Sequence, residues 1–567
     1  MTVVAADKMI AGAEVLVGGS PLPPKLADKI VEVRVDDNLM LPDCFLIRVA
    51  DAGLENIDDS PLQIGAEVTI RLAGSQAKAL TTVVEGQIAT LEPEFGAGAA
   101  ILAARGYDHS HALHREPRTL TYQNMTAGDI ARKVAQRGGL SAGTIDSGGG
   151  VHDFVQQSGE TDWAFLWRLA SDIDFEVVVA ERRLHFRQAG GPQDPPVPLS
   201  WGENLLSFRP RVTGIQQVER VLVRGWDPAS NAAIEGRATR PETDSKSGVA
   251  RGEIVDALGG GTVVVGDRAV TTQQEADALA MSVAARLANA ALEATGSCQG
   301  DARLKAGSRA EIKQIGRRFG GVYTLSAVTH VYRGAHGYRT HFTISGRAPR
   351  TLIDLISPPS PRAWGDSLAV GVVTQNDDPK KLGRVRVKYP ALGDGVEGWW
   401  ARIAAPGAAQ DRGMLMLPVP GDEVVVGFEN GDPRRPYVLG SLWNGTGQPG
   451  TLVQTDGSMA LRSAHQAAVT AKEDMALTSE EGRIVLAAKD VITVSTDADL
   501  SVEAKGKVDQ KATGELNVEA RQVAVKAGGG SVSIEGASHI EIKVGGASLK
   551  LSSAGSVQIS GTSIALG

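Results

Sequence analysis

The chain has 567 residues with a net charge of -8, and 42% of its residues are hydrophobic but only 4% aromatic. A chain of this length exceeds what one hydrophobic core supports, so we expect several domains. The 67 glycines beside so few aromatic rings favour turn-rich β structure. The acidic balance argues against a protein whose main role is to bind nucleic acid or an anionic membrane surface.

Cysteine content and hydropathy restrict the compartment. Cys44 and Cys298 are the 2 cysteines of the chain. No disulfide framework or cysteine-based metal site can therefore be read, which is typical of a protein made in a reducing cytoplasm. The N-terminus lacks a basic start followed by a sustained apolar run, and no stretch reaches about 18 apolar residues. We expect neither a cleaved secretion signal nor a membrane-spanning segment.

The first 350 residues alternate between strand and helix patterns. Residues 28–51 predict two strands, with Val31, Val33 and Val35 on one face, and the β pattern continues to about residue 95. Helices are predicted at about 126–138 and at 273–294. Between them, one apolar face at helical spacing predicts a further helix, with the residues Trp163, Leu166, Trp167 and Ala170.

A small barrel is predicted next. The Pro-rich stretch 355–365 and the Gly-rich stretch 444–450 bound a segment of short alternating strands separated by turn signals. In this segment Val385, Val387 and Tyr389 are expected to point inward, and the outward residues are Arg384, Arg386 and Lys388. With Trp399 and Trp400, these bases either form a nucleic-acid platform of the OB type or a solvated strand face over core tryptophans. The acidic chain favours the second interpretation.

A repeat with a period near eight begins at about Met459. Its units are apolar-x-apolar triplets, such as "IVL" at 484, "ITV" at 492, "LSV" at 500 and "LNV" at 516, and it continues to "IAL" at 564. Alternation places the two apolar side chains of each unit on one face of a strand. A short period of this kind is typical of a solenoid.

One such chain cannot bury its own apolar stripe. Each unit offers two apolar side chains, worth roughly 1.5–3 kcal/mol apiece when buried, against about 1–2 kcal/mol of backbone ordering for every residue. Three copies wound together would share a dry axis and would also remove the exposed strand edges. The alternative is a single-chain β-helix, which normally uses longer coils. The sequence favours the intertwined trimer.

Several motifs resemble one family. The pieces "GRVRVKYP" (383–390), "WWARIAAP" (399–406), "LPVPGDEVVVGF" (417–428) and "NGDPRRPYVLGSLWNG" (430–445) resemble the OB domain of phage baseplate spikes and of VgrG spikes. Upstream, "RGYDHSHALHR" (105–115), "SGETDWAFLWRLA" (158–170) and "EADALA" (275–280) resemble the hub shared by phage tail hub proteins, late-control D proteins and VgrG. A β-rod directly after the barrel is the arrangement of the same family.

The resemblance implies a mainly β fold with five parts. We expect a first hub β domain at 1–120, a small mixed α/β hub domain at 121–200, a second hub β domain at 201–356, an OB-fold at 365–445 and a trimeric β-helix spike at 451–567. In the family, three hubs with two tube-like domains each seat a hexameric inner tube.

The same resemblance implies function and partners. It predicts the central spike of a contractile injection system or phage-like tail, a homotrimer that pierces a target envelope when the sheath contracts. Expected partners are the inner tube protein, baseplate proteins, a PAAR-like tip protein, effector cargo and the target envelope, with no nucleic acid. Assembly is expected in the bacterial cytoplasm. The resemblance covers phage baseplates, type VI secretion systems and extracellular or cytoplasmic phage-tail-like systems alike.

Candidate chemistry is sparse. His109, His111 and His114, with Asp108 beside them, form one histidine cluster, and a metal site there is conceivable because His109 and His111 would share one face of a strand. The resemblance assigns this segment to a hub strand instead. The stretch 126–145 resembles a helix-turn-helix or a LysM element in outline, but it lacks a basic face or repetition, so a packing unit of the hub is expected.

No enzyme activity, catalytic residue, cofactor or metal is predicted, because no GxSxG, HExxH, CxxC or GxxxxGK[ST] pattern occurs. The alternatives are a trimeric β-helical tailspike enzyme acting on glycans and an OB-type nucleic-acid-binding protein. The tailspike enzyme needs carboxylates in an aromatic groove, and no Phe, Tyr or Trp follows Trp443.

The last residues are the candidate docking site. Three copies of Ile564, Ala565, Leu566 and Gly567 would form a blunt apolar triangle. We expect this triangle to need a separate conical cap of the PAAR type.

Overall fold

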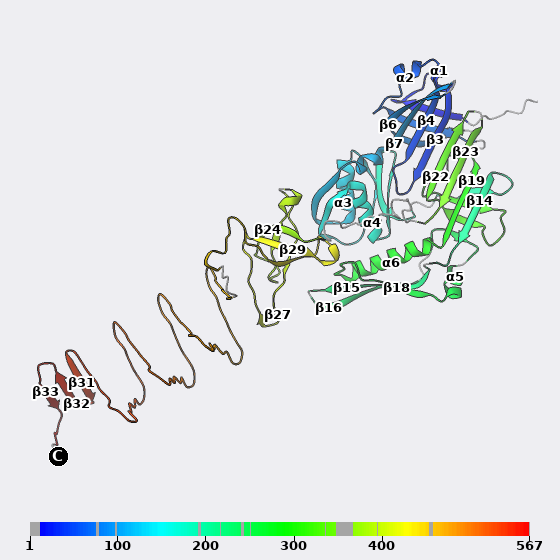
Figure 1. Cartoon of the computed structure of the whole chain (residues 1–567). Helices are drawn as coiled ribbons and strands as arrows, with labels where there is room; N and C mark the ends of the chain where they lie inside the picture. Colours follow the sequence, from blue (N-terminus) through cyan, green and yellow to red (C-terminus); the bar gives the residue numbers. More distant parts are fainter. Residues whose placement is uncertain are drawn as a thin grey trace, which may run out of the picture. The chain divides into compact units, whose positions relative to one another are not determined.

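The computed structural model describes residues 12–74, 79–96, 99–190, 194–215, 217–228, 230–239, 243–249, 251–334, 336–346, 367–393, 395–452 and 458–565. The chain divides into two compact units, Met1–Leu461 and Arg462–Gly567, which we describe separately. The protein is mainly β, as predicted, and strands far outnumber helices (Figure 1). The predicted boundaries of the five parts stay predictions.

One eleven-stranded sheet joins parts of the first unit that are distant in sequence. Strand β3 (Ile30–Asn38) pairs antiparallel with β22 (Ala327–Arg333), and Thr329 donates a hydrogen bond to Asp36, 293 positions away in the chain. The two predicted hub β regions therefore share one continuous sheet, with blue and green strands side by side in Figure 1. In order, its other strands are β14 (Leu205–Val212), β19 (Leu292–Gln299) and β23 (Gly337–Ile344) on one side, and β4 (Cys44–Ala50), β7 (Ala99–Asp108), β6 (Thr81–Gly96), β5 (Glu67–Ala73), β1 (Gly12–Val17) and β2 (Ser20–Pro21) on the other.

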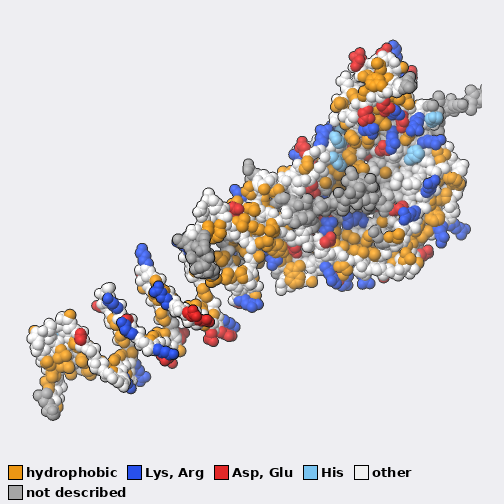
Figure 2. All heavy atoms as spheres, viewed as in Figure 1, with side chains coloured by type: hydrophobic (Ala, Val, Ile, Leu, Met, Phe, Trp, Pro, Cys, Tyr) orange, Lys and Arg blue, Asp and Glu red, His pale blue; other side chains and the backbone are white. Residues whose placement is uncertain are grey.

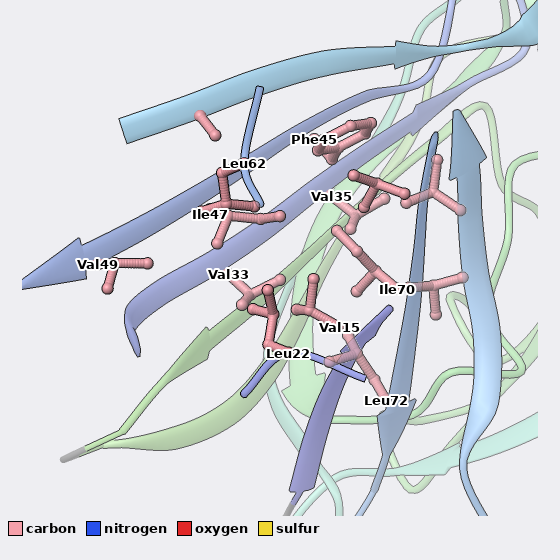
Figure 3. Close-up of a cluster of buried hydrophobic side chains, with 14 of the residues drawn as sticks. Val15, Leu22, Val33, Val35, Phe45, Ile47, Val49, Leu62, Ile70 and Leu72 are labelled. Carbon is pink, nitrogen blue, oxygen red and sulfur yellow. The ribbon is translucent and has the colours of Figure 1, made fainter. Parts of the chain in front are cut away.

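An aliphatic core lies against one half of this sheet. Alternate residues of its strands face inward, among them the fully buried Val33, Phe45, Ile47 and Ile70 (Figure 3). The short helices α1 (Pro24–Ala27) and α2 (Glu55–Asp59) flank these strands. The prediction that Val31 shares the face of Val33 and Val35 is wrong. Its side chain is 40% exposed, because the pairing of β3 with β4 shifts between Ile30 and Glu32 and the bulge breaks the alternation.

A small α/β insert follows, with helices close to those predicted. Helix α3 (Ala127–Arg137) begins where the Thr126 side chain accepts a hydrogen bond from the Asp129 backbone and the Asp129 carboxylate accepts one from the Thr126 backbone. Helix α4 (Asp162–Asp172) buries Trp163, Leu166 and Ala170. The two helices pack with the strands β8 (Pro117–Met125), β9 (Ser141–Ile145), β10 (His152–Thr161), β11 (Phe175–Ala180) and β12 (Arg183–Gln188).

Helix α6 (Gln273–Asn289) is shorter than the predicted 273–294. Residues from Leu292 onward form β19, which pairs with β14 and β23 and buries every second side chain. Local helix propensity there is overridden by long-range strand pairing. Helix α6 packs on β15 (Val218–Asp227) and β16 (Ala232–Thr239). The remaining elements of this region are β18 (Gly261–Val265), α5 (Arg251–Leu258), β13 (Val197–Ser200), β20 (Arg309–Lys313), β21 (Gly321–Thr324) and β17 (Lys246–Ser247).

The barrel segment forms a five-stranded sheet in the order β25-β24-β29-β30-β26. Backbone hydrogen bonds between Val385 and Ala401 join its two ends, so the sheet closes. Its strands are β24 (Ala369–Gln375), β25 (Arg386–Lys388), β26 (Arg402–Ile403), β29 (Glu423–Phe428) and β30 (Pro436–Ser441), with a small hairpin of β27 (Ala408–Ala409) and β28 (Arg412–Gly413) and 3-10 turns η2 (Pro390–Leu392), η3 (Glu429–Gly431) and η4 (Gly450–Leu452).

The second unit is an extended ribbon. Its described residues before His539 contain no strand or helix, and the chain runs in repeated bends (Figure 1). Three strands follow, β31 (His539–Val544), β32 (Ala547–Ser552) and β33 (Val557–Ser560). Across the described part of the chain, none of the helices combines the length and the hydropathy that a membrane crossing requires.

The bulge in β3 gives a matched pair of substitutions. Val33→Ala should lower the free energy of unfolding by about 1.5–3 kcal/mol, because two buried methyl groups are lost and a cavity is left. Val31→Ala, two residues away on the same strand, should change it by less than about 0.5 kcal/mol. Thermal unfolding of both variants measures the difference, and equal losses would contradict the bulge.

Candidate functional site

The barrel places its predicted inward residues as expected. Val385, Val387 and Tyr389 are at most 1% exposed. The arginines between them are paired: Arg384 donates to Asp378 at 2.6 Å and 2.9 Å, and Arg386 lies 2.5 Å from Glu397. The Arg384 guanidinium holds the pKa of Asp378 well below its usual range. Acids thus pair with both arginines, and of the three predicted outward bases Lys388 alone is exposed.

The tryptophans of the barrel have local partners. Trp399 stacks on Phe154 of the α/β insert with ring centroids 5.7 Å apart. Trp400 lies under the Arg384 guanidinium at 5.7 Å. Neither ring is left as an open stacking platform, so the arrangement fits the structural interpretation of these residues better than the nucleic-acid one.

A charged junction holds the barrel against the hub. The turn after β29 carries Arg434 and Arg435, and both reach Glu275 in the first turn of α6, at 3.7 Å and 3.9 Å. Arg435 also donates to the Thr271 hydroxyl. These side chains are only about a quarter exposed, so their charges are screened less than those of a surface pair.

A cavity of about 70 Å³ lies beside this junction. It is lined by apolar atoms of α4 and α6 and by charged groups, including Arg168, Asp172, Arg268 and Arg434. Arg268 lies 3.6 Å from Asp172, and Arg168 is held by Glu160 at 2.6 Å. The charges that line the cavity are thus already balanced in pairs.

The histidine cluster is dispersed. His109, His111 and His114 lie in a 3-10 turn, η1 (His109–His114), not in the predicted strand. His109 is 3.4 Å from Glu67, His111 stacks on Tyr107, and His114 stacks on Trp163. Burial lowers the pKa of His114 to about 4. Among the described residues, no three potential ligands come together as a metal site.

Sequence reasoning missed a partly buried group of three carboxyls. Asp37, Asp43 and Asp108 come together where β3 and β7 end and β4 begins. Asp37 also accepts from the backbone of Ala306, which belongs to the second hub region. Burial raises the pKa of all three groups, that of Asp108 to about 6. The pairing of the strands brings these three aspartates together, and no residue spacing in the sequence predicts this contact.

The ribbon leaves its apolar stripe uncovered. The large apolar residues of the units between Met459 and Ile534 are exposed from 51% at Met475 to 94% at Met459. Figure 2 shows them as apolar patches between charged side chains along the ribbon. A single chain thus has nothing within the described part of the ribbon that removes these side chains from water.

The candidate docking residues lie at the end of the ribbon. Ile564 is 53% exposed and Ala565 is also exposed. Leu566 and Gly567 lie outside the described residues. Their role as a docking site stays a prediction.

Family comparisons match most of the first unit. Residues 9–333, more than half of the 567-residue chain, match the family model of the Alg8 N-terminal domain. Residues 369–443 match the injector OB domain of the type VI secretion system and phage baseplate. The second match covers all five strands of the barrel, and so the predicted OB domain is confirmed.

Curated relatives match over shorter segments. The chain is 33% identical over 114 residues to the type VI secretion system spike protein VgrG5 of Pseudomonas aeruginosa, a match that covers 19% of this chain and 14% of that protein. It is 30% identical over 92 residues to the spike protein VgrG3 of Vibrio cholerae, covering 15% and 9%. A match of 29% over 97 residues to the actin cross-linking toxin VgrG1 of Vibrio cholerae covers 16% and 9%. The chain therefore aligns with only a small part of the length of these relatives.

Solved structures resemble the chain more broadly. A component of the type VI secretion system of E. coli, with structural similarity to the T4 tail proteins gp27 and gp5, aligns with a TM-score of 0.48 and 15% identity over 76% of this chain and 99% of that one. The 43 kDa tail protein of prophage MuSo2 from Shewanella oneidensis aligns with a TM-score of 0.47 and 14% identity over 59% and 98%. We draw no functional conclusion from similarities of this extent.

The charged junction predicts a salt-dependent stability. Glu275→Gln keeps an oxygen for the Thr271 backbone, which donates to Glu275 at 3.2 Å, but it removes the charge that faces two arginines. We expect the free energy of unfolding to fall by about 0.5–1.5 kcal/mol at low salt, and the loss to shrink in 1 M salt. Asp277→Asn, an exposed change on the same helix, is the control. A loss that is independent of salt would exclude the electrostatic explanation.

The group of three aspartates predicts that the stability of the protein depends on pH. A carboxyl whose pKa is raised by folding stabilises the folded state at low pH. This contribution is lost as pH rises from the ordinary pKa of the carboxyl to its pKa in the folded state. For Asp108 these two pKa values are 3.8 and about 6. Asp43→Asn should therefore raise the melting temperature at pH 7.5, by about 1–2 °C for ~1 kcal/mol in a unit of this size. The gain should shrink toward pH 4, because the wild-type carboxyls are then protonated.

Differential scanning calorimetry of the wild type and Asp43→Asn across this pH range measures the effect. The exposed Asp59→Asn is the matched control and should leave the pH profile unchanged. A lower melting temperature of Asp43→Asn at pH 7.5 would contradict the prediction.

Proposed function

Because the chain belongs to the Alg8 N-terminal domain family and to the VgrG and phage-baseplate spike proteins of contractile injection systems, we propose that it is the homotrimeric central spike that pierces a target envelope. The family membership gives the coarse role of a spike protein. Trimer formation, piercing and the partners are the proposal, and the exposed apolar stripe of the ribbon carries it.

The stripe supports several copies over one. Two apolar side chains recur in nearly every unit of eight residues, yet at least half of the surface of each large apolar side chain between Met459 and Ile534 is exposed. Burying them would contribute roughly 1.5–3 kcal/mol per side chain. Three ribbons around a common axis cover one another's stripes and pair one another's strand edges.

The hub supports the same threefold arrangement. Its eleven-stranded sheet carries two β regions joined by the pairing of β3 with β22. Three copies would present six such regions in a ring. A ring of six matches the symmetry of a hexameric inner tube, so the hub would adapt a threefold rod to a sixfold tube.

The proposed mechanism is mechanical. Sheath contraction supplies the work, and the sheet-closed rod transmits it to the envelope. Stiffness requires that no strand edge or apolar stripe stays in water, which the trimer achieves. The charged junction at Glu275 and the stack of Phe154 on Trp399 connect the barrel to the hub along this route.

Partners follow from the same role. We propose that the inner tube and baseplate proteins bind the hub, that effector cargo can travel with the spike, and that a conical PAAR-like protein caps Ile564, Ala565, Leu566 and Gly567. Assembly would take place in the bacterial cytoplasm, before the particle is fired or released.

Light scattering of the purified full-length chain tests the trimer. The expected mass is three times 59.3 kDa. Val518→Asp places a carboxylate in the stripe of each chain, so three charges would meet at a dry axis and the rod should dissociate or lose its ordered structure. Asn517→Asp, on the neighbouring outward position, should keep the trimer. A wild-type monomer, or equal behaviour of the two variants, would contradict the proposal.

A further inference from the structure

The last three strands differ from the rest of the ribbon. β31, β32 and β33 form an antiparallel meander in which every ladder lies within one chain. Ile540 faces Leu551, and Ile542 faces Leu549. Between Ser458 and Ser538, by contrast, the described residues make no strand and none of them is buried.

The meander has one apolar and one polar face. Directly opposed residues share a face, so the pairing puts six aliphatic side chains together, namely Ile540, Ile542, Leu549, Leu551, Val557 and Ile559. The other face carries a row formed by Glu541, Lys550 and Gln558, one from each strand. Figure 2 shows the apolar side chains gathered at this end of the ribbon.

Local chemistry specifies this pairing. The loop between β31 and β32 has two residues, Gly545 and Gly546, and Gly545 has a φ of +52°, a left-handed conformation that favours glycine. The next loop carries Gly555 at a φ of +77°, and its Ser552 and Ser556 hydroxyls lie 2.7 Å apart. Glu541 lies opposite Lys550 in the ladder, and its ion pair is with Lys543 of the same strand, at 3.1 Å. Short loops make these contacts local in sequence.

A single-layer sheet of three strands is not stable alone, because one of its faces stays in water. Ile542, Val557 and Ile559 are at least half exposed. The apolar face continues the stripe that the upstream units expose in the same way. The occupant that covers the upstream stripe, in the proposed trimer, is a second and third copy of the chain, and continuity makes the same copies the occupants here.

We propose that the distal end of the rod is a triangular prism of three in-chain sheets, in which each β31–β33 meander keeps its own strand pairing and packs its apolar face on two other copies. The chains would thus stop intertwining near His539. This inference rests on the proposed trimer, and it adds that the last segment associates by faces instead of by exchanged strands. Each copy would bury six aliphatic side chains in the prism.

Disulfide trapping in the full-length protein tests the topology. Val544 and Ala547 close the two-residue loop, so the alternation of the ladder makes Glu541 and Lys550 a non-hydrogen-bonded pair with close side chains. After oxidation, Glu541→Cys/Lys550→Cys should run as one chain on a non-reducing denaturing gel, with both engineered thiols consumed. The matched control Asn517→Cys/Ala524→Cys, at the central positions of two consecutive upstream units, should form no bond within a chain.

Other results would overturn the inference in distinguishable ways. Disulfides of Glu541→Cys/Lys550→Cys that link two or three chains, in a protein with the mass of a trimer, would mean exchanged strands and leave the proposed function intact. Unreacted thiols at this pair in the trimer would mean that the strands are not neighbours. A monomeric mass would reject the proposed trimer itself.

A labelling experiment tests the occupant. In the trimer, Ile559→Cys on the apolar face should be protected from a maleimide at least tenfold relative to Gln558→Cys on the polar face. Equal labelling of the two would show that the face is open and that another protein, such as a tip cap, is its occupant.

Discussion

An apolar stripe that one chain cannot cover is the constraint on which this molecule depends. Units of eight residues with two aliphatic side chains supply enough apolar surface for a core but too few layers to build one. Half or more of the surface of each large stripe residue between Met459 and Ile534 is exposed in the single chain. Between Ser458 and Ser538 the described residues of the ribbon therefore form no core of their own.

The hub differs from the ribbon, because its strands pair within one chain. The ladder between β3 and β22 joins residues almost 300 positions apart, and Asp37 and Ala306 hold the same junction through a hydrogen bond of 3.0 Å. The contacts between the hub and the barrel are few and of two kinds. Two arginines of the barrel lie near Glu275, and Trp399 stacks on Phe154.

Local signals in the sequence predicted local structure well. The pair Thr126 and Asp129 marks the start of α3, and the alternation of Val385, Val387 and Tyr389 gives the inner face of the barrel. Predictions were wrong where distant segments decide. The bulge beside Ile30 turns Val31 outward, the partners of β19 end α6 at Asn289, and the turn that holds His109 to His114 replaces a strand. The group of three aspartates and the charged junction were missed for the same reason. Both consist of residues that are far apart in the chain and meet only when the strands have paired.

The same repeat has two conformations in the described part of the ribbon, without strands before His539 and with three paired strands after it. Upstream units and the last three units share the same apolar-x-apolar pattern, so the pattern alone does not choose between pairing within a chain and pairing between chains. The loops choose. A two-residue loop with Gly545 in a left-handed conformation returns the chain on itself at once, and Ile540 then lies opposite Leu551. Between Ser458 and Ser538 the described units make no strand within the chain.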